Sequence, residues 1–147
     1  LEVLSDWSVT VPELGTIRAE VPPLVVLTSN RTRDLHDALK RRCLYHWVDH
    51  PSPEREVAIV RRRAPDVADE VARPVARLVA ELRRLHLTKP PGVAETIDWA
   101  TAISALGGGV TSETVERTLG AVLKYREDAE LARAAGLEEL VAASVAG

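Results

Sequence analysis

Hydrophobic residues along this chain follow two different periods. Between residues 7 and 48 they alternate with polar residues or form short β-branched runs, which is typical of strands. From residue 66 onward they recur every three or four positions, which is typical of helices with one buried face. The pattern predicts an α/β segment followed by an all-helical segment, with a boundary near residues 64–66.

The α/β segment is expected to contain a hairpin and two buried strands. Residues 7–18 alternate around a Pro-Glu-Leu-Gly turn, which predicts a β-hairpin. The runs LVVL at 24–27 and CLYHWV at 43–48 predict strands buried on both faces of a parallel sheet, with Cys43 in the core. A short charged helix is expected between them, at residues 31–40.

Capping residues and helix breakers divide the remaining chain into helices. Ser52 is a good N-cap before Pro53, and the Ala64-Pro65 pair ends the helix that follows. Pro74 lies inside a long apolar stripe and predicts a kink or a restart of that helix. The helices are expected at residues 53–63, 67–86, 93–106, 112–126, 128–134 and 137–146.

Composition indicates a packed protein without a membrane-spanning segment. The 147 residues are 46% hydrophobic and 28% charged, enough for one domain or parts of two small ones. No apolar run approaches the roughly 20 residues that a membrane-spanning helix needs. The single Cys43 excludes an internal disulfide and favours a reducing, cytoplasmic location. The chain begins at Leu1 and contains no methionine, so we expect it to be a piece of a longer protein.

Two places near the expected strands are candidates for chemistry. Asn30 follows the 24–27 run, where its amide either caps the next helix or orients a water or a terminal phosphate at the carboxyl end of the strand. Arg41 and Arg42 follow the 31–40 helix, where they either complement its negative end or reach a phosphoryl group held by a neighbouring subunit. The residues alone do not decide between these alternatives.

Other polar residues show no catalytic pattern. The four histidines lack the spacing of metal ligands, so no metal site is expected. The run Arg61-Arg62-Arg63 is either a solvated helix end or a patch for phosphate or nucleic acid, although the net charge of -3 gives no reason to expect nucleic acid. The chain has no GxxxxGK[ST] phosphate loop and no strand that ends in paired acids for magnesium.

In order and spacing these segments resemble the C-terminal portion of AAA+ ATPases, specifically the MoxR-type branch and its CoxD-like members. VVLTSN resembles the sensor-1 strand, which would make Asn30 the sensor-1 residue. ALKRRC resembles the arginine-finger segment, which places the finger at Arg42, with Arg41 as the second choice. KPPGVAETIDWA resembles the opening of the sensor-2 helix. Ala94-Glu95 stands where many relatives have an arginine, and Lys89 is the nearest basic residue.

The resemblance implies a fold, a function and partners. Residues 1–64 would be the C-terminal part of a P-loop α/β core, and residues 65–147 an all-α helical lid. The intact protein would hydrolyse ATP in a hexameric ring to remodel or mature a client, such as a metalloenzyme. ATP and Mg²⁺ would be bound mainly by a preceding part of the protein. Relatives often act with a partner that carries a von Willebrand A-type domain.

The chain lacks the phosphate loop that this family uses to bind ATP, so the chain alone is not expected to hydrolyse ATP. Hydrolysis is an expectation for the intact protein only. The competing hypothesis is a non-enzymatic module for helical interaction or nucleic-acid binding, which would use Arg61, Arg62 and Arg63.

Overall fold

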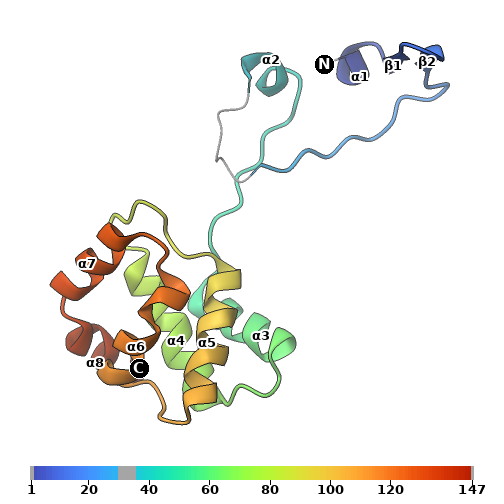
Figure 1. Cartoon of the computed structure of the whole chain (residues 1–147). Helices are drawn as coiled ribbons and strands as arrows, with labels where there is room; N and C mark the ends of the chain where they lie inside the picture. Colours follow the sequence, from blue (N-terminus) through green and yellow to red (C-terminus); the bar gives the residue numbers. More distant parts are fainter. Residues whose placement is uncertain (1, 30–35, 147) are drawn as a thin grey trace. The chain divides into compact units, whose positions relative to one another are not determined.

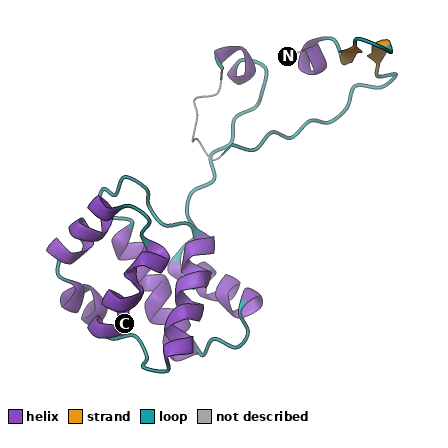
Figure 2. Cartoon of the chain, in the orientation of Figure 1, coloured by secondary structure: helices purple, strands orange, loops and turns teal. Residues whose placement is uncertain are grey.

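Helices make up most of the regular structure, and the residues described contain one two-stranded sheet (Figure 2). The structure is a computed structural model that describes residues 2–29 and 36–146. It divides the chain into two units, Leu1–Val48 and Asp49–Gly147. The boundary expected near residues 64–66 therefore lies inside the second unit, between two of its helices.

The N-terminal unit contains the predicted hairpin. Short helix α1 (Glu2–Ser5) precedes strands β1 (Ser8–Val11) and β2 (Gly15–Arg18), which pair antiparallel. Thr10 lies opposite Thr16, and their hydroxyl oxygens are 3.1 Å apart. Gly15 takes a φ of 75° at the turn, a backbone conformation that glycine adopts without steric cost. The alternating pattern of apolar and polar residues thus predicted this hairpin correctly.

The two parallel strands expected at residues 24–27 and 43–48 are not present, and this prediction is wrong for the structure. Both runs are extended loop, Leu24 is 95% exposed, and Cys43 is exposed instead of lying in a core. A strand forms only within a ladder of inter-strand hydrogen bonds, and the described ranges offer these runs no partner strand. The expected helix at 31–40 is represented by α2 (Asp37–Lys40), and residues 31–35 lie outside the described residues.

The helical unit contains the helices that the apolar periodicity predicted. The long helix ends at Leu82, earlier than expected, and Arg83 is its C-cap. The helix after Thr111 ends at Val122 because Leu123 turns to an extended, buried conformation. The helices are α3 (Pro53–Arg63), α4 (Asp69–Leu82), α5 (Val93–Leu106), α6 (Ser112–Val122), α7 (Arg126–Ala134) and α8 (Leu137–Ala146).

The helix ends follow the capping signals of the sequence. Ser52 Oγ accepts a hydrogen bond from the Arg55 N–H at 3.3 Å, and Thr111 Oγ1 accepts one from the Thr114 N–H at 3.2 Å. Gly107 ends α5 with a φ of 70°. Pro74 lies within α4, which continues through it, so the predicted restart does not occur.

The core of the helical unit is built around α4, which packs against α3, α5 and α8 (Figure 1). Trp99 of α5 is fully buried, and its indole Nε1 donates to Thr118 Oγ1 of α6 at 2.7 Å. Because α3 packs against α4 and α5, it belongs to this unit, which explains the position of the division at Val48. Fully buried core residues include Val60, Val75, Leu78, Val79, Leu82 and Ile103.

We expect residues 49–147 to fold without the N-terminal unit and Leu78→Ala to destabilise them by about 2–5 kcal/mol, because the change leaves a cavity beside α4. Urea denaturation followed by far-UV circular dichroism measures this. Leu106→Ala is the matched control: Leu106 is 45% exposed, so its loss should change the unfolding free energy by less than about 0.5 kcal/mol. Equal effects of the two changes would contradict the assigned core.

Candidate functional site

Two of the expected N-terminal site residues, Arg41 and Arg42, directly follow the short helix α2. Asn30 lies outside the described residues, so its role stays a prediction. Arg41 is the C-cap of α2, and its backbone N–H donates to the carbonyl of Asp37 at 3.0 Å. Arg42 is exposed and donates from Nη1 to Ser5 Oγ at 2.7 Å. Both arginines thus lie at a helix end, and neither forms an ion pair within the described ranges.

Residues adjacent to Asn30 and Arg41 in the sequence line one small pocket of the N-terminal unit. The pocket has a volume of about 110 Å³, and its walls include Ser29 from one segment and Lys40 and Cys43 from the other. The structure therefore brings together the ends of the two segments that carry the candidate residues.

Lys89 lies in the helical unit, on the connection between α4 and α5. Its ammonium is exposed and has no hydrogen-bond or ion-pair partner among residues 2–29 and 36–146. The backbone that carries it is held by the fully buried carboxylate of Asp128, in the first turn of α7. This carboxylate accepts hydrogen bonds from the N–H groups of Thr88 at 2.7 Å and Lys89 at 3.1 Å. Arg83 Nε donates to the carbonyl of Pro91 at 2.8 Å, so the loop is anchored on both sides of Lys89.

The helical unit also contains a buried ion pair that the sequence did not predict. Arg83 Nη1 lies 2.8 Å from Glu56 Oε2, and Nη2 lies 2.7 Å from Oε1. Thr96 Oγ1 donates to Glu56 Oε1 at 2.6 Å, and the Glu56 side chain is fully buried. These contacts join α3, the end of α4 and α5. The missed signal is periodic: Glu56 stands one turn before Val60 on the apolar face of α3, where a carboxylate needs a buried partner.

The basic run of the competing hypothesis is partly neutralised. Arg61 Nε donates to Asp69 Oδ1 at 2.7 Å, its Nη2 contacts the other carboxylate oxygen, and Arg73 lies 3.5 Å from that same oxygen. The hydrogen bond with Arg61 holds the pKa of Asp69 below its ordinary value and raises the pKa of Arg61. Arg62 and Arg63 remain exposed at the end of α3. Only part of the run is thus available to an anion.

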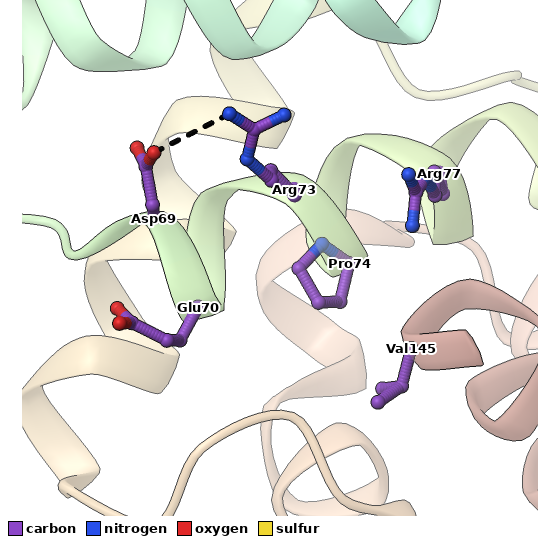
Figure 3. A pocket seen from close by; sticks show the side chains of 6 residues that line it. All are labelled: Asp69, Glu70, Arg73, Pro74, Arg77 and Val145. Carbon is purple, nitrogen blue, oxygen red and sulfur yellow. Dashed lines mark ion pairs between the residues drawn. The ribbon is translucent and has the colours of Figure 1, made fainter. Parts of the chain in front are cut away.

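A larger, open pocket lies beside Asp69, with a volume of about 520 Å³. Figure 3 shows Asp69 and Arg73 facing one another on one side of α4, whereas Glu70 points away from them. Arg77, further along the same helix, donates to the carbonyl of Ser144 at 3.3 Å. The charged side chains therefore bind protein groups or point apart, and they do not converge on a single ligand position.

Two kinds of feature are missing from the described ranges. No cluster of three His, Cys, Asp or Glu side chains there could hold a metal ion. No helix in the same ranges has the length and apolar character needed to cross a membrane.

No protein-family model matches this chain, and neither a curated protein nor a solved structure matches it.

We expect stability to fall as the pH drops below neutrality because of His50. The His50 side chain is exposed, and its partial burial, followed by the charge of Arg83, lowers its pKa from 6.5 against smaller opposing effects of Glu56 and Asp49, so the effect on stability is small. The unfolded chain therefore binds this proton at a higher pH than the folded chain does. This contribution to stability is present above pH 6.5 and is lost as the pH falls from that value through the lower pKa of the folded chain. Urea denaturation between about pH 7.5 and about pH 5.5 should show a falling free energy of unfolding.

His50→Gln should remove most of this pH dependence, because it removes the group that titrates. His86→Asn is the control: it deletes another imidazole and places asparagine, which tolerates a left-handed backbone, at a φ of 38°. Comparison of the two variants shows whether the pH dependence belongs to His50. A His50→Gln protein that loses as much stability as the wild type over the same interval would contradict the assignment to His50.

Proposed function

We propose that this chain is the C-terminal portion of a MoxR-type AAA+ ATPase, which hydrolyses ATP in a ring to remodel or mature a client protein. In the intact protein Asn30 orients the attacking water, Arg42 reaches the terminal phosphate of a nucleotide on a neighbouring subunit, and Lys89 contacts nucleotide from the helical unit. Residues 1–48 belong to the α/β core, and the helical unit is the lid. This places α3 with the lid helices, in keeping with its packing.

The observation that carries the proposal is the exposure of two strand-like apolar runs. Leu24 and Val26 are 95% and 78% exposed, and Val48 is 82% exposed. Burying such side chains is favourable by about 25 cal/mol per Å² of apolar surface, so a folded protein rarely leaves whole runs in water. The valines of the first run and the aromatic residues of the second fit strands of a parallel sheet. A sheet supplied by another part of the protein would bury both runs and their backbone groups.

The arginines support the same proposal. The Arg42 side chain is exposed and its guanidinium donates to the neutral Ser5 hydroxyl, so the guanidinium can be redirected to a phosphate at little cost. Arginine suits this role because its planar fork matches phosphate oxygens. The backbone N–H groups of Arg41 and Arg42 both bond to carbonyls of α2, so Arg41 remains the second choice only because the resembling segment ends in Arg-Cys.

The described residues contribute only part of a nucleotide site. They contain no cluster of ligands for Mg²⁺, so no magnesium ligand is assigned to this chain. Lys89 is the residue of the helical unit that we assign to ATP, through its exposed ammonium. The phosphate loop and the magnesium ligands are proposed to come from the remainder of the protein, together with the ring partners. A client and a von Willebrand A-type partner are part of the same proposal.

The competing proposal, a nucleic-acid-binding or helical interaction module, has weaker support. It would rely on three consecutive arginines, and Arg61 is already bound to Asp69. Nucleic-acid affinity comes chiefly from cations that neutralise phosphates, and a net charge of -3 gives the chain no overall attraction to a polyanion.

We expect Arg42→Ala in the intact ATPase to lower kcat for ATP hydrolysis about 10³-fold or more, as removal of a trans-acting arginine does. Mixing this variant with a phosphate-loop variant should restore activity, since a ring can combine the intact halves of both. Steady-state ATPase assays at ring-forming concentrations measure both effects. The Arg41→Ala variant tests whether Arg41, the second choice, is the arginine finger instead. The Arg62→Ala variant is the control, because Arg62 is exposed at the end of α3, and it should hydrolyse ATP at the wild-type rate.

If the Arg42→Ala variant hydrolyses ATP at the wild-type rate, Arg42 is only a positive charge at the end of a helix, and its assignment to the nucleotide site is wrong. Tight binding of duplex DNA by this chain, lost in Arg62→Ala and steeply dependent on salt, would favour the competing proposal instead.

A further inference from the structure

The Lys89 loop is held by more buried charge than a simple helix connection requires. Asp128 is fully buried and binds two consecutive N–H groups, those of Thr88 and Lys89. Across the loop, Arg83 binds the Pro91 carbonyl while its other nitrogens hold the buried Glu56. Apolar contacts alone would suffice to join two helices, and removing a carboxylate from water is costly.

The geometry of Asp128 explains how its burial is tolerated. It lies in the first turn of α7, where the positive end of the helix dipole favours a negative charge. Its two oxygens each accept one backbone N–H, so the ionised form is matched to the loop and a neutral side chain is not. The carboxylate therefore fixes the position and direction of the peptide units on both sides of the Thr88–Lys89 bond.

The lysines of the chain differ in what their ammonium groups do. Lys40 is paired with Asp37, and Lys124 donates to the carbonyls of Gly120 and Ala121. The ammonium of Lys89 has no such partner within the described ranges, although its backbone N–H is bound by the buried carboxylate of Asp128. A cation without a partner on a fixed backbone is pre-organised for an external anion, because less entropy is lost when the anion binds.

We propose that Asp128 is a positioning residue that holds Lys89 for contact with a nucleotide phosphate. This inference rests on the proposed function, which assigns Lys89 to ATP. Asp128 acts only through Lys89: it touches the loop backbone and leaves the lysine side chain to bind the phosphate. The inference adds a residue 39 positions away in the sequence to the nucleotide site.

The test uses Asp128→Asn, alone and combined with Lys89→Ala. Asparagine keeps one acceptor for the Thr88 N–H and turns its amide group toward the Lys89 N–H, so two donors face each other. In this chain the backbone amides of Thr88 and Lys89 should exchange hydrogen about tenfold faster or more. In the intact ATPase the KM for ATP should rise about three- to tenfold with kcat nearly unchanged, because ground-state binding of ATP is what weakens.

The double variant separates positioning from general stability. If Asp128 acts through Lys89, Asp128→Asn should raise KM no further once Lys89 is alanine, so the two effects are not additive. Glu127→Gln is the matched control: it removes a neighbouring, exposed charge from the same first turn of α7 and should leave exchange and KM unchanged. If Asp128→Asn loses helix content, Asp128→Glu, which keeps the charge but displaces the oxygens, replaces it in the same comparison.

The outcomes distinguish this inference from the proposed function. Faster exchange at Thr88 and Lys89 with an unchanged KM, or an equal rise in KM in the Lys89→Ala background, would overturn the role of Asp128 alone. A wild-type protein that does not hydrolyse ATP would overturn the proposed function and the nucleotide role of Lys89 with it.

Discussion

The buried ion pair between Glu56 and Arg83 is the constraint on which the helical unit depends. Two parallel hydrogen bonds, with a third from Thr96, join α3, the end of α4 and α5 at one point. Removal of one partner would leave a charge without compensation in the interior, which typically costs about 3–5 kcal/mol. The same guanidinium binds the loop that carries Lys89. Helix packing and the presentation of Lys89 therefore depend on a single side chain.

The individual helices of the helical unit could be predicted largely from local signals. Which helices pack against one another could not be predicted in this way. Ser52 and Thr111 identify helix starts within a few residues, because caps act through neighbouring backbone groups. The Ala64-Pro65 break was also read correctly as a helix end, whereas the contacts divide the chain after Val48 instead of at this break. A break in the chain does not tell whether the flanking helices pack together, and α3 and α4 do.

In the N-terminal unit, by contrast, local signals predicted two strands that the structure does not contain. Residues 24–27 and 43–48 have strand composition, yet a strand also needs a partner, which composition cannot supply. For the candidate site, Arg41 and Arg42 were correctly placed at a helix end from sequence alone. Asp128 and Glu56 could not be connected to their partners, because those partners are 27 to 40 residues away and no local pattern marks them.

The burial of Trp99 also makes the helical unit spectroscopically simple. Trp7 and Trp47 lie in the N-terminal unit, so a polypeptide of residues 49–147 contains one indole. That indole is fully buried between α5 and α6 and hydrogen-bonded to Thr118. Its emission wavelength and quenching by iodide then report on one known interhelical contact. Intrinsic fluorescence can thus follow the packing of this unit without any added label.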